Sequence, residues 1–137
     1  MIEGIAHACY RVRDLNRAVK FYCDEIGLKQ AFEFINKEGR RTGVYIHVGG
    51  RGFIELFEGE VLEQKGTGSY LHLCLEVDDI KATAIGLRGR GIEVSDPRFG
   101  GDGSWQAWIT DPDGNRIELM QYTKESKQEA ALRAAGL

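Results

Sequence analysis

Two histidines and two glutamates lie at equivalent places in two similar halves of this sequence: His7, Glu55, His72 and Glu118. Each glutamate interrupts an apolar, strand-like run between an isoleucine and a leucine. A lone carboxylate that faces a dry core is costly unless it has a partner. Two carboxylates and two imidazoles at equivalent positions suggest one shared partner, and a divalent metal ion supplies the required charge. Nitrogen and oxygen donors of this kind suit Zn, Ni, Co, Fe or Mn.

A metal held by these four side chains would be catalytic in character. Four protein ligands leave an octahedral ion two positions for water or substrate, and open positions are typical of catalytic sites. Each residue taken alone has a simpler interpretation, because single strand histidines are often structural and single strand glutamates usually face solvent. His47, which has no histidine at the equivalent place in the other half, is interpreted as structural or cavity-facing.

An internal repeat positions the four residues. Residues 5–15 align with residues 70–80, so that His meets His, Cys meets Cys and Asp meets Asp. Asp14 and Asp79 each follow the histidine by seven positions. Both suit a helix N-cap, because their carboxylates accept hydrogen bonds from free backbone N–H groups. A helical pattern of apolar residues follows each of them.

Three extended segments are expected after each helix. In the first half they cover about 28–35, 42–48 and 52–58, and in the second about 92–95, 104–111 and 115–122. Gly27 and Gly91 precede them, where a helix end favours a left-handed residue. Each half is therefore predicted to run strand–helix–strand–strand–strand.

The predicted fold class is α+β, with two tandem βαβββ modules. Residues 1–63 form the first module and residues 70–122 the second, joined by a Lys-, Gly- and Thr-rich linker at 64–69. The tail at 123–137 is rich in Ala, Lys and Glu and is predicted to be helical.

Strand alternation predicts which neighbours share a face with the histidines and glutamates. Residues two apart in a strand share a face, so Arg11 lies on the face of His7. Gln106 and Trp108 also share a face and are predicted to line a cleft, although tryptophans are commonly core or interface residues. Arg98 either binds a substrate carboxylate or is a solvated loop cation.

Composition and charge limit the classes of function. The chain has 137 residues, of which 42% are hydrophobic and 28% charged, as in an ordinary globular protein. Its net charge of −3 gives no reason to expect a nucleic-acid partner. No apolar run could cross a bilayer, and the first residues lack a signal-peptide pattern. Cys9, Cys23 and Cys74 are interpreted as buried free thiols of a cytoplasmic protein.

The sequence resembles the vicinal oxygen chelate superfamily, which includes glyoxalase I, methylmalonyl-CoA epimerase, extradiol dioxygenases, and fosfomycin- and bleomycin-resistance proteins. The resemblance runs from about Ile5 to Tyr122. It rests on His7 with Asp14-Leu15 and Phe21-Tyr22, on Ile26-Gly27-Leu28, on His72 with Val77-Asp78-Asp79, and on Thr110–Leu119. It implies paired modules that form a U-shaped, partly open mixed sheet around the metal. It also implies a homodimer, in which one subunit can supply two ligands and its partner two.

The ligand set resembles that of glyoxalase I, the lactoylglutathione lyase. The dioxygenases typically use two His and one Glu, and the epimerase has Gln at the position that is Glu55 here. Short bacterial glyoxalases are often nickel enzymes, so the resemblance favours Ni or Zn.

The resemblance implies a metal-dependent lyase or isomerase acting on vicinal oxygens, such as those of a methylglyoxal hemithioacetal, through a metal-bound enediolate. Glu118 would take the α-proton, and Glu55 would serve reprotonation from the opposite side. Family members that use glutathione hold it with an Arg, matched by Arg11, and an Asn. Gly59 stands at the Asn position, which leaves the use of glutathione open.

Two other functions remain as alternatives. One is another metal-dependent enzyme of the superfamily, either an extradiol-type dioxygenase or an epimerase. The other is a metal-free drug-binding module, which is disfavoured because sequestering proteins of this fold usually lack the metal ligands.

Overall fold

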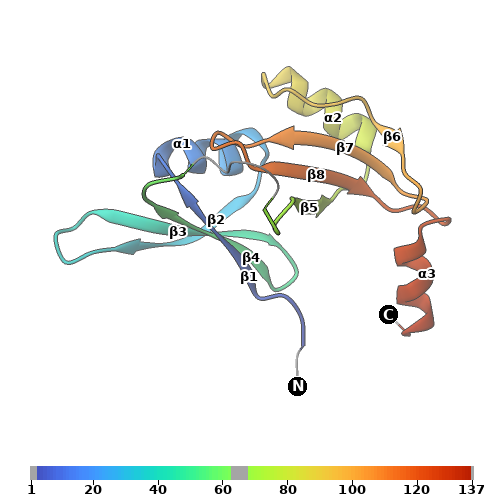
Figure 1. Cartoon of the computed structure of the whole chain (residues 1–137), viewed down its shortest axis with the longest axis horizontal. Helices are drawn as coiled ribbons and strands as arrows, with labels where there is room; N and C mark the ends of the chain where they lie inside the picture. Colours follow the sequence, from blue (N-terminus) through green and yellow to red (C-terminus); the bar gives the residue numbers. More distant parts are fainter. Residues whose placement is uncertain (1–2, 63–67, 137) are drawn as a thin grey trace. The chain divides into compact units, whose positions relative to one another are not determined.

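The computed structural model describes residues 3–62 and 68–136 and divides the chain into two compact units, Met1–Thr67 and Gly68–Leu137 (Figure 1). The predicted linker at 64–69 falls largely on residues 63–67, which lie outside the described residues. Within the described part of the chain, every helix is too short or too polar to be a candidate for spanning a membrane.

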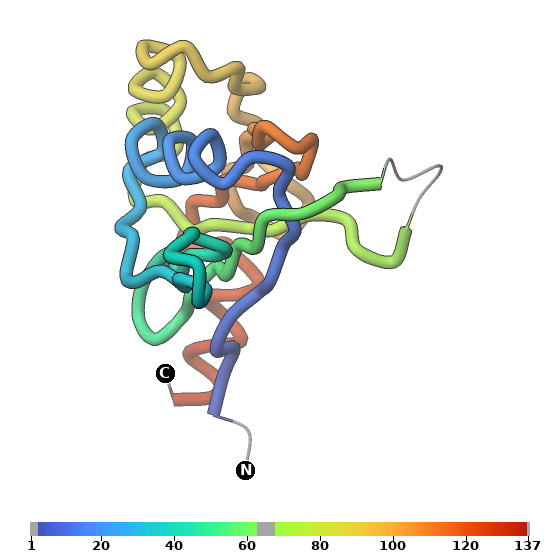
Figure 2. The backbone as a smooth tube through the Cα atoms, turned by 90° about the vertical axis from the view of Figure 1, so that its left-hand side faces the viewer, coloured from blue at the N-terminus to red at the C-terminus, as the bar shows by residue number. Residues whose placement is uncertain are grey.

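Unit 1 is a βαβββ module, as predicted. Its elements are β1 (His7–Val12), α1 (Leu15–Val19), the π-helical η1 (Lys20–Glu25), β2 (Lys29–Ile35), β3 (Arg41–Gly49) and β4 (Gly52–Glu58). The strand order is β1-β4-β3-β2, with β1 parallel to β4 and the other pairs antiparallel. Figure 2 shows α1 and η1 as one continuous coil in blue.

Unit 2 repeats this plan. Its elements are β5 (Leu73–Glu76), α2 (Ile80–Gly89), β6 (Arg98–Phe99), β7 (Trp105–Thr110), β8 (Arg116–Gln121) and the tail helix α3 (Lys127–Ala134). The strand order is β5-β8-β7-β6, and β5 is parallel to β8. The α+β fold class is therefore confirmed, and the tail contains the helix α3 at Lys127–Ala134.

One face of each sheet forms the core with its helix. In unit 1 the buried apolar residues include Leu15, Ala18 and Tyr22 of the helical segment and Val44, Ile46, Ile54 and Leu56 of the strands. In unit 2 they include Ile80, Ala84, Leu87, Ala107, Ile109, Ile117 and Leu119. Because strand residues alternate between faces, the other face of each sheet presents the remaining side chains away from the helix.

The predicted N-caps are confirmed. The Asp14 carboxylate accepts from the Arg17 N–H, and the Asp79 carboxylate accepts from the N–H groups of Lys81 and Ala82. Each cap satisfies backbone donors that the first helical turn leaves without intrahelical partners.

The predicted strand at 92–95 is wrong. The short strand of this region is β6, at Arg98–Phe99. Both Nε and Nη2 of Arg88 donate to the Val94 carbonyl oxygen, at 3.2 and 2.8 Å. The guanidinium therefore takes the Val94 carbonyl oxygen, which would otherwise accept a hydrogen bond from a neighbouring strand. The apolar Ile92 and Val94 are buried without belonging to a strand.

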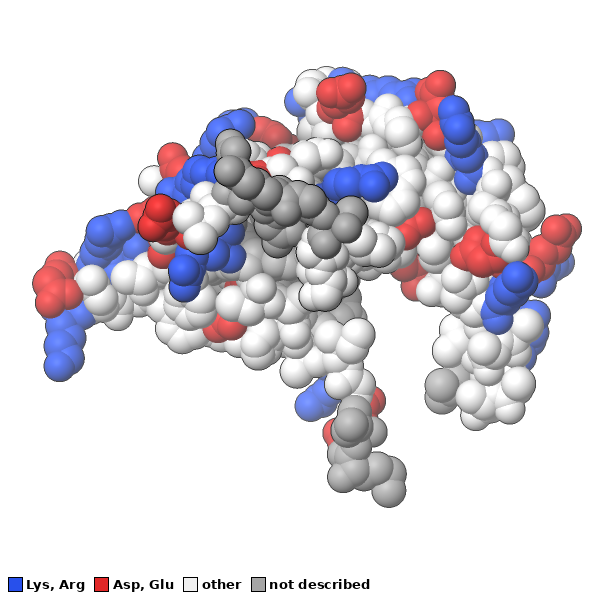
Figure 3. Space-filling view, in the orientation of Figure 1, with Lys and Arg blue, Asp and Glu red and all other residues white. Residues whose placement is uncertain are grey.

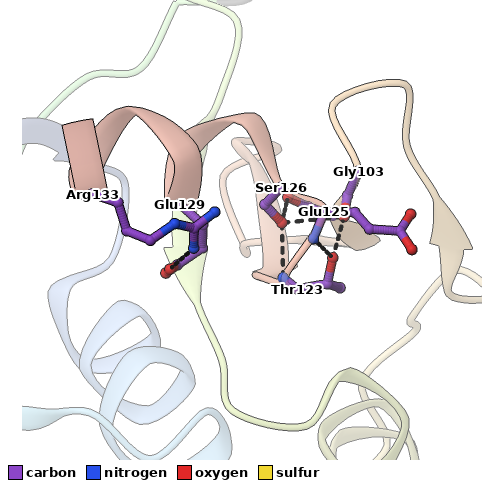
Figure 4. Close-up of polar contacts among 7 residues, drawn as sticks. Gly103, Thr123, Glu125, Ser126, Glu129 and Arg133 are labelled. Atoms are coloured by element: carbon purple, nitrogen blue, oxygen red, sulfur yellow. Dashed lines mark hydrogen bonds and ion pairs between the residues drawn. The ribbon is translucent and has the colours of Figure 1, made fainter.

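A polar cluster attaches the start of the tail helix to the loop before β7 (Figure 4). The Ser126 Oγ lies 2.8 Å from the Ser104 Oγ and accepts from the Thr123 N–H at 2.7 Å. The Thr123 hydroxyl donates to the Gly103 carbonyl oxygen at 2.7 Å. Gly103 has φ +83°, and a Cβ there would lie 2.4 Å from the Glu125 carbonyl oxygen, so the close approach requires glycine.

In each unit, a side chain from the last strand of the sheet accepts a hydrogen bond from the first backbone N–H of the helix. In unit 1 a Glu58 carboxylate oxygen accepts from the Leu15 N–H at 3.2 Å and also pairs with Arg40. In unit 2 the Gln121 side-chain oxygen accepts from the Ile80 N–H at 2.9 Å. Unit 1 therefore has a charged version of a contact that is neutral in unit 2.

Acid should weaken this contact in unit 1 specifically. The Leu15 N–H and the Arg40 guanidinium lower the pKa of Glu58 in the folded chain. A lowered folded pKa contributes stability above the unfolded pKa of about 4.3, and that stability is lost as pH falls through the folded pKa. We expect Glu58→Gln to lower the melting temperature at about pH 7, and the difference from wild type to shrink near about pH 3.

Thermal unfolding followed by circular dichroism at both pH values checks this expectation. Glu60→Gln, a neighbouring exposed carboxylate, is the matched control. A difference between Glu58→Gln and wild type that does not change with pH would contradict the assignment.

Candidate metal centre

The first histidine and glutamate lie together on the face of the unit 1 sheet that is turned away from the helix. Cys9 of β1 pairs with Glu55 of β4, which pairs in turn with Tyr45 of β3. His7 Nε2 lies 3.4 Å from Glu55 Oε2. The His7 side chain is 40% exposed and the Glu55 side chain 13%, so the carboxylate is largely covered while the imidazole is open.

The second pair has the same arrangement in unit 2. His72 directly precedes β5, and its Nε2 lies 3.0 Å from Oε2 of Glu118 on β8. The Glu118 side chain is 7% exposed, between the buried Ile117 and Leu119. Trp108 pairs with Glu118 in the sheet, and its ring meets the His72 ring edge-on at 4.9 Å.

The donor atoms of each pair are as far apart as two adjacent ligands of one ion, a separation that is equally typical of a hydrogen-bonded ion pair. Two adjacent ligands of an octahedral ion at about 2.1 Å lie about 3.0 Å apart, and those of a tetrahedral ion about 3.4 Å apart. The observed separations are 3.0 and 3.4 Å. Among the described residues, no cluster of three or more His, Cys, Asp or Glu could hold an ion, so the donors come as two pairs, one in each unit. That all four bind one ion remains a prediction.

Tyr45 is a residue of the site that the sequence reasoning missed. Its hydroxyl lies 3.4 Å from His7 Nδ1, and its ring meets the imidazole edge-on at 5.5 Å. Desolvation, together with the charge of Glu55, raises the pKa of the Tyr45 hydroxyl. The signal was present in the repeat, since Tyr45 occupies in unit 1 the place that Trp108 has in unit 2, opposite the glutamate.

The cysteines correct a second prediction. Cys9 and Cys74 are exposed, and Cys23 is half-buried, so the interpretation of three buried thiols is wrong. Cys9 and Cys74 lie on the faces that carry Glu55 and Glu118. Partial desolvation and the Glu118 carboxylate raise the pKa of the Cys74 thiol to about 12. Partial desolvation and Glu55 likewise raise that of Cys9. Both thiols are therefore protonated at neutral pH beside their carboxylates.

The remaining predicted residues of unit 2 lie on the face of Glu118, as alternation requires. Arg116 lies over the Trp108 ring, with its guanidinium carbon 4.2 Å from the ring centroid. Gln106 pairs with Arg98 of β6, and its amide nitrogen lies 3.5 Å from an Asp102 carboxylate oxygen. Trp108 and Gln106 are half-buried and Arg98 is exposed.

Arg11 lies on the face of His7 but against an unexpected neighbour. A Cβ built at Gly59 would lie 2.9 Å from Arg11 Cδ and 3.2 Å from its Nε. The stem of the arginine thus crosses the space into which an asparagine at this position would extend. His47 was interpreted as structural or cavity-facing. It makes a structural contact, because its Nε2 lies 3.1 Å from the Gly50 carbonyl oxygen.

Charges of both signs are scattered over the face of the molecule drawn in Figure 3. On the face drawn in Figure 3, Lys and Arg side chains are interspersed with Asp and Glu. The mixed pattern agrees with the net charge of −3 and differs from the basic stripe typical of nucleic-acid binding.

Comparisons with known proteins place these features in context. The model of a family described as the Glyoxalase/Bleomycin resistance protein/Dioxygenase superfamily matches residues 4–119. A probable lactoylglutathione lyase of Vibrio parahaemolyticus is 32% identical over 130 residues, covering 89% of this chain and 93% of that protein. The metallothiol transferase FosB of Staphylococcus epidermidis is 25% identical, covering 93% of this chain and 88% of that protein.

A solved structure is similar over nearly its whole length. The antibiotic binding protein TnmS3 of Streptomyces sp. CB03234 is 27% identical with a TM-score of 0.72, covering 89% of this chain and 98% of that chain. Such similarity does not by itself choose among a lyase, a transferase and a binding protein.

Proposed function

Because the chain belongs to the glyoxalase/bleomycin resistance protein/dioxygenase superfamily, we propose that it is a metal-dependent lyase or isomerase of the glyoxalase I type. Its substrate class would be compounds with two vicinal oxygens, such as the hemithioacetal of methylglyoxal. The observation that carries the proposal is the pair of repeat-equivalent His–Glu contacts at 3.4 and 3.0 Å. The 32% identity with a probable lactoylglutathione lyase supports the choice of reaction.

The metal would be held by His7, Glu55, His72 and Glu118. Members of this family generally use a divalent metal, and two imidazoles with two carboxylates suit Ni, Zn, Co, Mn or Fe, with Ni or Zn favoured. The ion would supply Lewis-acid stabilisation of negative charge on the two substrate oxygens. The proposal requires both pairs to meet at one ion, within one chain or between the two chains of a homodimer.

The two carboxylates would move the proton. Glu118 would accept a proton from the carbon next to the substrate carbonyl, and Glu55, entering in its protonated form, would donate a proton to the carbonyl carbon. Transfer of the proton from Glu118 back to Glu55 would restore the starting state. The Glu118 side chain is the less exposed of the two, at 7% against 13%, which limits proton exchange with bulk water. The Trp108 ring lies between Arg116 and His72 at this side of the site.

Substrate contacts outside the metal would come from Arg11, Arg98, Gln106 and Trp108. Arg11 and Arg98 would bind anionic groups of the substrate or of its thiol partner. The Gln106 amide nitrogen lies 3.5 Å from an Asp102 carboxylate oxygen, and a Cβ at Gly100 would lie 2.7 Å from it, so the amide packs closely against the loop before β7. The Arg11 side chain occupies the space beside Gly59 into which an asparagine would extend. The proposal therefore does not specify which thiol is the partner.

Reconstitution of metal-free chain tests the proposal. Ni²⁺ or Zn²⁺ should restore isomerisation of the hemithioacetal that methylglyoxal forms with a thiol. This isomerisation involves no net oxidation or reduction, so it does not require a redox-active metal. Activity that appears only with Fe(II), catechol and oxygen would favour a dioxygenase. Fosfomycin opening by a thiol would favour a transferase like the staphylococcal relative. Purified chain that retains no divalent metal and turns over none of these compounds would favour a binding module.

A further inference from the structure

The two ring nitrogens of His7 face different partners. Nε2 lies 3.4 Å from Glu55 Oε2, and Nδ1 lies 3.4 Å from the Tyr45 hydroxyl oxygen. A neutral imidazole has one N–H and one nitrogen lone pair. If the lone pair of Nε2 binds an ion beside Glu55, the proton must sit on Nδ1 and needs an acceptor there. The Tyr45 hydroxyl can accept this proton, because a phenolic oxygen carries lone pairs.

His7 needs such a partner, because little else restrains its ring. It is the first residue of β1, and its side chain is 40% exposed. An exposed side chain samples several rotamers, and fixing it in one of them costs conformational entropy. A hydrogen bond to Nδ1 in the metal-free chain would pay part of that cost before an ion binds.

The Tyr45 ring is itself held by the rings of neighbouring strands. Phe32 of β2 stacks on it, with ring centroids 4.4 Å apart and planes 16° from parallel. Phe34 of the same strand meets it edge-on at 5.9 Å, and Phe53 of β4 lies at 5.7 Å. The phenolic oxygen sits at the end of a rigid ring. Contacts that restrict the ring therefore also restrict the position of the hydroxyl beside Nδ1.

The shared plan of the two units does not require this hydroxyl. Trp108 takes the place of Tyr45 in unit 2, opposite Glu118, and its ring also meets a histidine ring edge-on. An indole has an N–H donor but no acceptor, so it cannot take a proton from His72. The ring contact is thus common to both units, whereas the tyrosine hydroxyl at the histidine is a feature of unit 1.

We propose that Tyr45 is a positioning residue, whose hydroxyl accepts the Nδ1–H of His7 and so directs Nε2 toward the metal ion. This rests on the proposed function, in which His7 is a metal ligand. Histidines that bind metals almost always donate their other ring N–H, and that bond fixes both the tautomer and the orientation of the ring. Tyr45 acts through His7, and no contact with substrate is assigned to it.

Removal of the hydroxyl alone tests the proposal. Tyr45→Phe keeps the ring and its contacts with the neighbouring phenylalanines. It should weaken binding of Ni²⁺ or Zn²⁺ by roughly 10–100-fold, the usual effect of losing an outer-shell partner, as measured by competition with a chromophoric chelator.

Tyr10→Phe is the matched control. Tyr10 is a half-buried tyrosine of β1 that pairs with the fully buried Leu56, and strand alternation places it on the opposite face from His7. This variant should bind both ions as wild type does.

Nitrogen-15 NMR of the histidine rings in the metal-free full-length chain supplies a second measurement, which a purely structural role of Tyr45 would leave unchanged. Tyr45→Phe should shift the Nδ1 signal of His7, because that atom loses its partner, and should leave the ring signals of His72 in place. Wild-type metal affinity in Tyr45→Phe would overturn the proposal. So would a loss of affinity without any change at His7 Nδ1, because Tyr45 would then act by another route.

The outcome is separable from that of the proposed function, because neither measurement uses turnover. A chain whose metal affinity depends on the Tyr45 hydroxyl but which fails to isomerise hemithioacetals would support the positioning role and contradict the proposed reaction. A chain that isomerises them and binds metal equally well as Tyr45→Phe would do the opposite.

Discussion

Replacement of Glu118 by glutamine should lower kcat for methylglyoxal hemithioacetals by about 10²–10⁴-fold, the usual contribution of a positioned base. The change keeps the size of the side chain and one oxygen donor but removes the atom that accepts the proton. Glu118 lies 3.0 Å from His72 and is 7% exposed, so few water molecules can replace the lost carboxylate. Steady-state kinetics with the metal-loaded chain measures the effect.

The matched control is Glu76→Gln. Glu76 lies on β5, pairs with Met120 of β8 and is exposed, so it is on the same face of the same sheet as Glu118. Its replacement should leave kcat within about twofold of wild type, since Glu76 is exposed and has no assigned part in the reaction, and exposed substitutions usually have small effects. Metal content must be measured in both variants, because loss of the ion would lower kcat for a different reason. Near wild-type turnover by metal-loaded Glu118→Gln would exclude the assigned role.

Much of the candidate site follows from strand periodicity. Alternation placed Arg11 with His7, and Gln106 with Trp108, because side chains two apart must share a face in any regular strand. Helix caps are equally local, since Asp79 accepts from backbone groups two and three residues away. Features set by neighbours in the sequence are therefore predictable from it.

Features that depend on pairing between distant segments were missed. Tyr45 lies 38 residues from His7 in sequence, and the register of β3 on β4 brings it to the site, so only its repeat equivalence with Trp108 could have pointed to it. The strand predicted at 92–95 failed because a guanidinium from α2 takes the Val94 carbonyl. Such contacts depend on tertiary structure, which local patterns do not encode.

The cysteine prediction failed for a different reason. Apolar neighbours suggested burial of Cys9, but those neighbours point to the opposite face of the strand from the cysteine. Alternation already placed Cys9 with His7, so the pattern of faces should have outweighed the average hydrophobicity of the segment. The same argument applies to Cys74 in the second unit.

Replacement of His7 or of His72 by alanine should weaken binding of Ni²⁺ or Zn²⁺ by more than about 100-fold. Loss of an outer-shell partner already costs 10–100-fold, and each histidine is proposed as a direct ligand. Competition with a chromophoric chelator measures the affinity, and elemental analysis gives the number of ions per chain. His47→Ala is the control, because His47 also lies on a strand but contacts the Gly50 carbonyl. It should bind metal as wild type does.

The number of ions decides whether the two His–Glu pairs act as one site. If His7–Glu55 and His72–Glu118 share one ion, wild type binds a single ion per chain, and either alanine variant loses all tight binding. The double variant is then no worse than either single one, because residues of one site are strongly non-additive. If each pair holds its own ion, wild type binds two, each variant loses one, and the losses add. Additive losses would separate the pairs and remove the shared centre on which the proposed reaction depends.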